Sequence, residues 1–253
     1  MNHIEIRAAK IHQALCAAFP NEKTSRFVSA IICAAGSGER MGGISKQLYP
    51  LQGMPCIFYT IRAFQNASSV DEIVLVIRPD EDKEIRKIIL NNGFDKVKKV
   101  VFGGKTRAES VQNGFFAIDP KADLVAIHDG DRPLIKPDQI DRVVKDAIRY
   151  GAATAASPLT DSVKAGTESG MIDRSVPREN LYTVQTPQVF LTDMYRVSLA
   201  VTHKNKEAFT DDNSMVEKAG FKVKLCLLDD FNIKLTLPGD GNRIELVLKG
   251  RSL

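Results

Sequence analysis

Short apolar runs rich in β-branched residues alternate along the chain with longer segments of helical period. The apolar runs predict strands at 28–34, 72–77, 97–102, 124–128 and 223–228, with a weaker sixth at 153–157. The periodic segments predict helices at 54–66, 80–92, 107–118, 137–150, 192–204 and 211–219. Such alternation is typical of an α/β fold with a mostly parallel sheet and helices on both faces. Ligands of such sheets bind at the carboxyl ends of the strands, so the loops that follow the strands are the places to look for chemistry.

Residues 158–186 interrupt this alternation. The segment is polar, has no helical period and carries Gly166 and Gly170 as turn signals. It predicts an extended arm or hairpin. The pattern leaves open whether the arm lies on a second subunit or folds back onto its own domain.

The first 27 residues form a separate pattern. Ile4, Ala8, Ile11 and Leu15 follow helical spacing and Pro20 ends the run, which predicts a short amphipathic helix. Charges interrupt any apolar core, so we do not interpret it as a signal peptide. We expect a helical extension over 1–27 followed by a single domain over 28–253.

Composition narrows the class of protein. Of 253 residues, 43% are hydrophobic and 26% charged, the balance of a soluble globular protein. The net charge of +4 is slight, no basic patch is interleaved with aromatics and there is no Trp, so we expect no nucleic-acid partner. No apolar run approaches the roughly 18 residues of a membrane span, so we expect no membrane contact.

The four cysteines show no metal-binding spacing. Cys16, Cys33, Cys56 and Cys226 contain no C-x-x-C pair, and only four histidines could join them, so we expect no zinc site. Cys33 and Cys226 lie in apolar runs and are interpreted as small core residues. Reduced thiols fit a cytoplasmic protein.

The loop after the first strand, "AAGSGERMGGISKQ" (34–47), is rich in glycine. Glycines let backbone N–H groups wrap a phosphate. The spacing matches neither the dinucleotide fingerprint nor the P-loop. Arg40 and Lys46 add two cations, so the loop predicts a polyphosphate site.

A second glycine turn, "GGKTRAES" (103–110), follows the third strand. It carries Lys105 and Arg107, and Ser110 could offer a hydroxyl to a base or sugar. A simple strand–helix connection explains the pattern equally well.

The fourth strand leads into "HDGDRP" (128–133). Asp129 and Asp131 resemble the D-x-D arrangement that holds a divalent metal between nucleotide phosphates, and Mg²⁺ prefers few carboxylates plus phosphate oxygens. Arg132 could instead pair with either acid, and His128 is interpreted as a half-buried structural residue. Near the C-terminus, "FNIKLT" places Lys234 in an apolar segment, where a lysine is costly to bury unless it meets an anion. A surface lysine is the alternative.

These motifs occur together with "TDSVK", "VPRENLYTVQTPQVF" and "TDDNSMVEKAG". In this order the chain, from about Val28 to about Leu248, resembles the 2-C-methyl-D-erythritol 4-phosphate cytidylyltransferase family. The ribitol 5-phosphate cytidylyltransferases share most of these marks. The resemblance implies a Rossmann-like nucleotidyltransferase fold with a protruding β-arm and a homodimer in which each arm reaches the partner's site. It also implies CTP and Mg²⁺, with CMP transferred to a polyol phosphate and pyrophosphate released, in non-mevalonate isoprenoid precursor synthesis.

The resemblance also implies roles for individual residues. Triphosphate binding falls to the first glycine loop, through Ala34, Ala35, Gly36 and Gly38. The catalytic cations would be Arg40, Lys46 and Lys234, with Lys234 also between the two phosphates. Gly104 and Ser110 would hold the cytosine, and Asp129 and Gly130 would contact the ribose or the metal region. The D-x-D pattern, rather than the resemblance, makes Asp131 a candidate metal ligand beside Asp129. The polyol phosphate would meet Asp129, Arg132, Ser162, Arg178, Thr186 and Lys234, some of them across the dimer.

Three positions depart from the family pattern. Ser45 stands where Pro is usual, Asp131 adds a charge where Ala is usual, and Ser162 replaces Thr but keeps the hydroxyl.

The expected chemistry needs no general base. A substrate phosphate is already a nucleophile, so the lack of a Ser-His-Asp or Cys-His set fits phosphoryl chemistry. A non-catalytic nucleotide-binding regulator, a sugar-nucleotide pyrophosphorylase and a scaffold are the competing classes, and the first would not need all three cations.

Overall fold

The computed structural model describes residues 26–36, 38, 45–205, 209, 211–228 and 232–251. The predicted N-terminal helix and Arg40 lie outside these residues.

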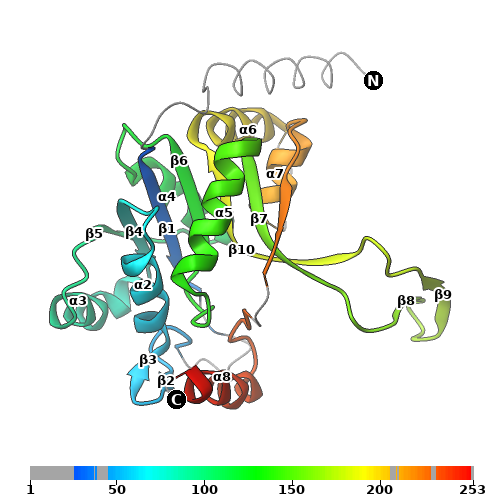
Figure 1. Cartoon of the computed structure of the whole chain (residues 1–253), viewed down its shortest axis with the longest axis horizontal. Coiled ribbons are helices and arrows are strands. Elements are labelled where there is room, and N and C mark those ends of the chain that lie inside the picture. Colours follow the sequence, from blue (N-terminus) through cyan, green and yellow to red (C-terminus); the bar gives the residue numbers. More distant parts are fainter. Residues whose placement is uncertain are drawn as a thin grey trace.

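A seven-stranded sheet forms the centre of the protein, in the order β11-β7-β10-β6-β1-β4-β5 (Figure 1). The strands are β1 (Val28–Ala34), β4 (Glu72–Ile77), β5 (Val97–Phe102), β6 (Leu124–Asp129), β7 (Ala152–Pro158), β10 (Tyr182–Leu191) and β11 (Lys224–Leu227). All neighbouring pairs are parallel except those of β10, which runs antiparallel to β6 and β7. Strands β4 and β6 are buried throughout and β1 nearly so, as expected of a sheet covered on both faces. The six predicted strands and the mostly parallel sheet are confirmed.

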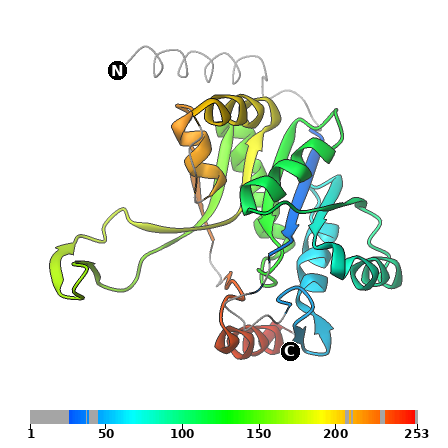
Figure 2. The ribbon, with the colours of Figure 1, turned by 180° about the vertical axis from the view of Figure 1, so that it is seen from behind.

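Helices cover both faces of this sheet. The described helices are α2 (Cys56–Asn66), α3 (Asp82–Asn91), α4 (Arg107–Ala117), α5 (Pro137–Tyr150), α6 (Thr192–Asn205), α7 (Asp212–Lys218) and α8 (Pro238–Arg251), with a 3₁₀ turn η2 (Pro79–Glu81) before α3, and not all of them lie on a face of the sheet. Helices α2 and α5 lie on one face, whereas α4 and α6 lie on the other, which Figure 2 shows from behind. The six predicted helices are confirmed with small shifts at their ends. Residues 54–55 are the exception, because they form β3 (Met54–Pro55) opposite β2 (Pro50–Leu51).

Local sequence signals explain where the helices begin and end. Thr106 and Glu109 form a reciprocal capping box at the start of α4. Helix α5 starts with Pro137 and ends at Tyr150, followed by the cap residue Gly151, whose φ of +86° suits glycine. Because α4 follows the end of β5 after a short turn, its N-terminus lies at the carboxyl edge of the sheet.

The predicted arm is a hairpin that projects from the ends of β7 and β10 (Figure 1). Its strands are β8 (Val163–Gly166) and β9 (Ile172–Val176). The prediction was wrong for 182–186, which belong to the central strand β10 rather than to a free arm. Tyr182, Thr183 and Val184 pair with the end of β7, and this pairing makes the polar stretch an extension of the sheet.

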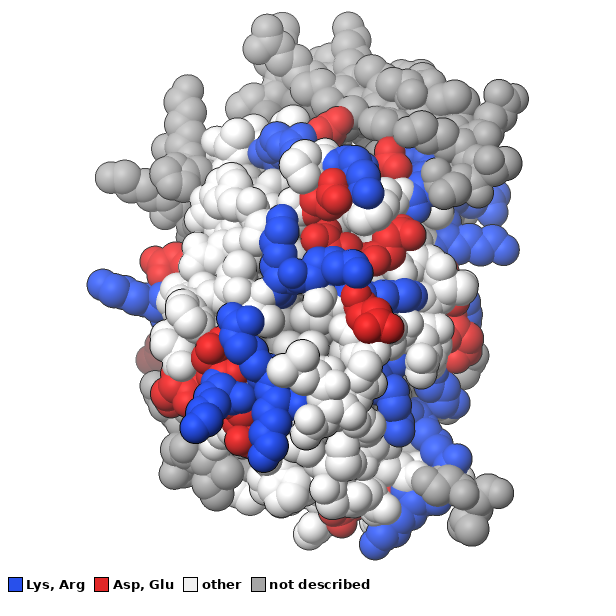
Figure 3. Space-filling model, turned by 90° about the vertical axis from the view of Figure 1, so that its left-hand side faces the viewer, with Lys and Arg blue, Asp and Glu red and all other residues white. Residues whose placement is uncertain are grey.

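Positive and negative side chains are interspersed on the face of the molecule that Figure 3 shows. On the face in Figure 3, Lys and Arg lie beside Asp and Glu rather than in a continuous basic stripe. Among the described residues, no helix is long and apolar enough to span a bilayer.

Candidate active site

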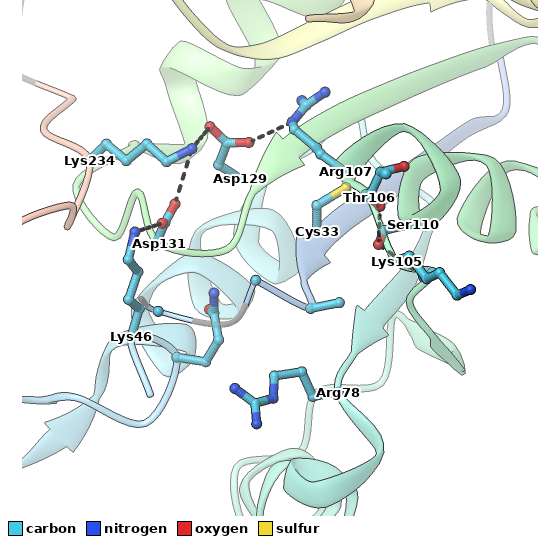
Figure 4. A pocket seen from close by; sticks show the side chains of 15 residues that line it. Cys33, Lys46, Arg78, Lys105, Thr106, Arg107, Ser110, Asp129, Asp131 and Lys234 are labelled. Carbon is cyan, nitrogen blue, oxygen red and sulfur yellow. Dashed lines mark hydrogen bonds and ion pairs between the residues drawn. The ribbon is translucent and has the colours of Figure 1, made fainter. Parts of the chain in front are cut away.

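A cavity of about 650 Å³ opens at the carboxyl ends of β1, β4, β5 and β6 (Figure 4). Its lining comprises Cys33, Ala35, Gly36, Gly38, Lys46, Gln47, Arg78, Gly104, Lys105, Thr106, Arg107, Ser110, Asp129, Asp131 and Lys234. Five of these side chains are cations and two are carboxylates. A cleft with this excess of positive charge attracts polyanions.

Asp129, the last residue of β6, is the centre of the charged network. Its Oδ2 accepts from Lys234 Nζ at 2.9 Å and from Arg132 Nε at 3.3 Å. Its Oδ1 lies 3.5 Å from Arg107 Nε. Burial works to raise the pKa of this carboxyl, but the three cations outweigh it and hold the pKa well below its usual range. Asp129 is therefore ionised, and its carboxylate holds Lys234, Arg132 and Arg107 in position.

Asp131 joins the two lysines that the sequence singled out. Lys46 Nζ lies 3.4 Å from Asp131 Oδ2, and Lys234 Nζ lies 3.8 Å from Asp131 Oδ1. Both ends of the Lys46 pair are nearly buried, with side-chain exposures of 9% and 10%. Burial and the nearby Asp129 raise the pKa of Asp131, against the pull of the lysines. The structure thus brings Lys46 and Lys234 together around one carboxylate, as Figure 4 shows.

Arg107 is held by a second acid that the sequence interpretation missed. Its Nη1 donates to Asp212 Oδ2 at 2.8 Å, and Tyr195 OH donates to Asp212 Oδ1 at 2.7 Å. Burial, followed by the charge of Asp212, raises the pKa of Tyr195 and keeps this phenol a donor. Asp212 lies 105 residues from Arg107, so only the unexplained motif "TDDNSMVEKAG" could have pointed to it.

The "QTPQ" stretch of β10 ties these groups together. Thr186 Oγ1 accepts from the backbone N of Asp129 and contacts His128 Nδ1, each at 3.1 Å. Gln188 Oε1 accepts from the backbone N of Asp212 at 3.1 Å. One strand therefore fixes both carboxylates that face Arg107.

His128 is fully buried, not half-buried as predicted. Its Nε2 lies 3.3 Å from the carbonyl oxygen of Arg132, so both ring nitrogens have partners. Burial lowers the pKa of His128 to about 3, so the ring is neutral. It supports the loop after β6 and does not face the cavity.

The glycine turns bring backbone close to the cavity. A Cβ on Gly103 would lie 2.3 Å from Ala35 Cβ, and one on Gly104 would lie 2.3 Å from Glu109 Cβ. Gly38 has a φ of +70°. Ala35, Gly36, Gly38 and Gly104 line the cavity, whereas Ala34 is buried behind them. Ser110 also lines it, but its hydroxyl accepts from Gly104 N at 3.1 Å and donates to the Thr106 carbonyl at 2.9 Å.

The interpretation of Cys33 as a small core residue was wrong. It is half-buried at the end of β1 and lines the cavity instead of lying in the core. Burial raises the pKa of its thiol to about 12, so the thiol is protonated. Cys226 is buried, as predicted.

The remaining predicted residues lie away from the cavity wall. Gly130 is a packing residue, since a Cβ there would lie 2.7 Å from Gln47 Oε1. Arg132 Nη1 donates to the carbonyl oxygen of Asn232 at 2.8 Å. Ser162 and Arg178 are exposed at the base of the arm, and Arg178 Nη1 donates to the Thr160 carbonyl.

The carboxylates are also the oxygen donors available for a metal. The described residues contain no group of three or more His, Cys, Asp or Glu placed to hold an ion. Asp129 and Asp131 both face the cavity. That donor set suits Mg²⁺ with phosphate oxygens and water completing its shell, not an all-protein cage.

Known proteins match the chain over most of its length. The model of the 2-C-methyl-D-erythritol 4-phosphate cytidylyltransferase family matches residues 28–250. A 2-C-methyl-D-erythritol 4-phosphate cytidylyltransferase of Pelotomaculum thermopropionicum is 39% identical over 226 residues, which is 88% of this chain and 95% of the relative. That of Clostridium novyi is 39% identical over 226 residues, which is 87% of this chain and 96% of the relative.

Solved structures agree. The 4-diphosphocytidyl-2C-methyl-D-erythritol synthase of Anaerococcus prevotii superposes with a TM-score of 0.79 at 28% identity, covering 88% of this chain and 96% of that one. The fold and the charged cavity at the strand ends define an α/β nucleotidyltransferase. Within that class, the chain belongs to the 2-C-methyl-D-erythritol 4-phosphate cytidylyltransferase family.

Proposed function

We propose that this protein transfers CMP from CTP to the phosphate of 2-C-methyl-D-erythritol 4-phosphate and releases pyrophosphate, a step in non-mevalonate isoprenoid precursor synthesis. The observation that carries the proposal is the convergence of Lys46 and Lys234 on Asp131 inside a cavity with five cationic side chains. Family membership supports the choice of substrates.

The reaction must bring two anions together. At about 4 Å, two unit charges repel by roughly 1 kcal/mol in water and about 4 kcal/mol at an effective dielectric constant of 20. Lys46 and Lys234, with Arg40 from the glycine loop, offset this repulsion. The substrate phosphate attacks the α-phosphorus in line, the bond to the bridging oxygen breaks, and pyrophosphate leaves. The protein contributes positioning and charge stabilisation, and no general base is required.

The cavity wall divides between the two ends of CTP. The backbone of the first glycine loop would bind the triphosphate, through Ala34, Ala35, Gly36 and Gly38. The turn after β5 would hold the cytosine through Gly104 and Ser110. Asp129 would lie at the ribose, with Gly130 supporting it from behind the cavity wall. Asp129, Arg132 and Lys234 would lie toward the polyol phosphate.

Mg²⁺ is part of the proposal. Asp129 and Asp131 would hold it together with phosphate oxygens, and it would neutralise charge on the departing pyrophosphate. With Mg²⁺ on the carboxylates, Lys46 and Lys234 would be available to the phosphates.

The arm suggests how the polyol phosphate site is completed. Ser162 and Arg178 belong to an arm that projects away from its own sheet (Figure 1). Their proposed role, together with Thr186, is to bind the polyol phosphate, with some of these residues acting across the interface of a cytoplasmic homodimer. Sedimentation velocity of wild type and of a chain lacking 160–178 checks this, since only the wild type should be dimeric.

Pyrophosphate release with CTP and Mg²⁺ tests the substrate. Methylerythritol 4-phosphate and ribitol 5-phosphate are offered in parallel at equal concentration. We expect release with the first. A preference for ribitol 5-phosphate would keep the mechanism and change the substrate, and release with neither would contradict the proposal.

A further inference from the structure

Gln47 places a buried amide at the wall of the main cavity. The residue follows Lys46, lines the cavity and is 3% exposed. Its Oε1 is buried and, among the residues that the structure describes, has no hydrogen-bond partner. A buried polar atom without a partner destabilises a fold, so the great majority of such atoms are paired. Packing alone therefore does not account for an amide at this position.

The neighbours of this amide fix its place in the site. A Cβ built on Gly130 would lie 2.7 Å from Gln47 Oε1, so the amide oxygen lies close to the loop after β6. Asp129 and Asp131 flank that glycine, and both line the cavity. The backbone oxygen of Gln47 accepts from the backbone N of Ile57 at 3.0 Å, which ties the residue to α2. The amide is thus held beside the two carboxylates of the site.

An unpartnered amide oxygen is an acceptor, so the group that pairs with it must be a donor. The lysines of the cavity already have charged partners. Lys46 Nζ lies 3.4 Å from Asp131 Oδ2. Lys234 Nζ lies 2.9 Å from Asp129 Oδ2. Hydrogen bonds between charged groups are roughly twice as strong as neutral ones, so these lysines favour a carboxylate or a phosphate over an amide, and the donor must come from a ligand.

The substrates of the proposed reaction bring two kinds of donor. Ionised phosphates present acceptor oxygens, so they do not pair with Oε1. The amino group of cytosine is a donor, but its proposed site is the turn after β5, at Gly104 and Ser110. The hydroxyl groups of the ribose and of the polyol are the other donors. Asp129, next to Gly130 in the chain, is the residue proposed to lie near both.

We propose that Gln47 is a substrate-binding residue, and that its Oε1 accepts a hydrogen bond from a hydroxyl group of a substrate. The ribose of CTP and the polyol phosphate both present this chemistry, and binding measurements on each distinguish them. This role rests on the proposed function, because the donor belongs to one of its substrates. The amide oxygen is unpaired in the free protein and becomes paired when the substrate binds.

Thermal melting of Gln47→Met tests whether the amide is unpaired in the free protein. Methionine is similarly long and flexible, but it has no donor and only a weak acceptor. The substitution removes an unpartnered polar atom, so we expect the melting temperature to rise by about 2–4 °C. Gln139→Met is the matched control, since Gln139 is 2% exposed and its Oε1 accepts from the backbone N of Lys136 at 3.1 Å. Loss of that bond should lower the melting temperature.

Calorimetric titration with CTP and Mg²⁺, without the polyol phosphate, tests the ribose. If the ribose supplies the donor, the wild type should bind CTP about 10-fold more tightly than 2′-deoxy-CTP or 3′-deoxy-CTP, and Gln47→Met should lose that preference. If the polyol supplies it, Gln47→Met should bind CTP normally. Its KM for methylerythritol 4-phosphate in pyrophosphate release should then rise about 10-fold. Gln139→Met should change none of these constants.

The outcomes separate the role of Gln47 from the proposed function. A wild type that neither binds CTP nor releases pyrophosphate overturns both. An active wild type whose constants for CTP, its deoxy analogues and the polyol phosphate are all kept in Gln47→Met overturns the role of Gln47 alone. A change confined to the Mg²⁺ concentration for half-maximal activity also overturns it, because the donor would then be a metal-bound water. So does a melting temperature that falls as far as that of Gln139→Met.

Discussion

Replacing Lys234 with alanine should lower kcat by about 100-fold and leave the protein folded. Lys234 Nζ lies 2.9 Å from Asp129 Oδ2 and 3.8 Å from Asp131 Oδ1, and its side chain is 31% exposed. At a separation of about 4 Å, a unit charge pair is worth roughly 1 kcal/mol in water and about 4 kcal/mol at a dielectric constant of 20. A partly exposed lysine lies between these limits, and about 2.7 kcal/mol corresponds to 100-fold in rate.

The fold should survive because Asp129 keeps two other cations. Arg132 Nε and Arg107 Nε remain within 3.3 Å and 3.5 Å of its carboxylate oxygens. The assay is steady-state pyrophosphate release, with thermal melting as the check on folding. Lys99→Ala is the matched control, since Lys99 lies on β5 outside the cavity and donates to the carbonyl oxygen of Ala117. A wild-type kcat in Lys234→Ala, or an equal loss in Lys99→Ala, would refute the reasoning.

Three further predictions follow from single residues. The His128 ring should show no NMR titration between pH 7.5 and pH 5, because its pKa in the folded protein is about 3. In the unfolded state its pKa is about 6.5, so the unfolded state binds the proton first as the pH falls. The free energy of unfolding should therefore fall as the pH drops from 6.5 toward 3, by roughly 2 kcal/mol at pH 5. A ring titrating near pH 6.5 would contradict the burial argument. Gly114→Ala should destabilise the protein by about 1–3 kcal/mol in urea denaturation despite the helix preference of alanine, because the new Cβ would lie 2.6 Å from Ile31 Cγ2. Gly250→Ala is the control, because a Cβ there would have nothing within 4 Å, and it should be neutral or stabilising. Equal effects of the two substitutions would contradict the packing argument. Asp131→Asn should raise the Mg²⁺ concentration for half-maximal activity several-fold, and an unchanged Mg²⁺ titration would remove Asp131 from the proposed metal site.

The elements that the sequence predicted well are those with a strong period. Strands β1, β4 and β6 are mostly apolar runs, and α5 has a proline at its start and a glycine directly after its end. The local hydrophobic pattern and the capping residues determine such elements, so they can be predicted from a single sequence.

Strand β10 was missed because its polar middle and Pro187 argue against a strand. The structure accommodates them with a shift in register between Val184 and Gln188, where pairing with β7 is interrupted. Helix α8 was missed because Gly239, Gly241 and Gly250 weigh against a helix. Its start is fixed instead by Asp240, whose Oδ2 accepts from the backbone N of Leu237.

For the candidate site, the sequence indicated which loops carry the functional residues, but not which side chains contact one another. Lys46, Asp129, Asp131 and Lys234 were singled out, and they meet in one cavity. The pairing of Arg107 with an acid 105 residues away depends on how β10 and α7 fold together. No local pattern encodes that distance.

Isotope labelling can show whether CMP is transferred by substitution at the α-phosphorus of CTP. The protein is incubated with methylerythritol 4-phosphate, Mg²⁺ and CTP labelled with ³²P at either the α- or the γ-position. We expect the α-label to move to a diphosphocytidyl polyol and the γ-label to pyrophosphate. Release of the α-label as free CMP, or its retention in CTP, would contradict it.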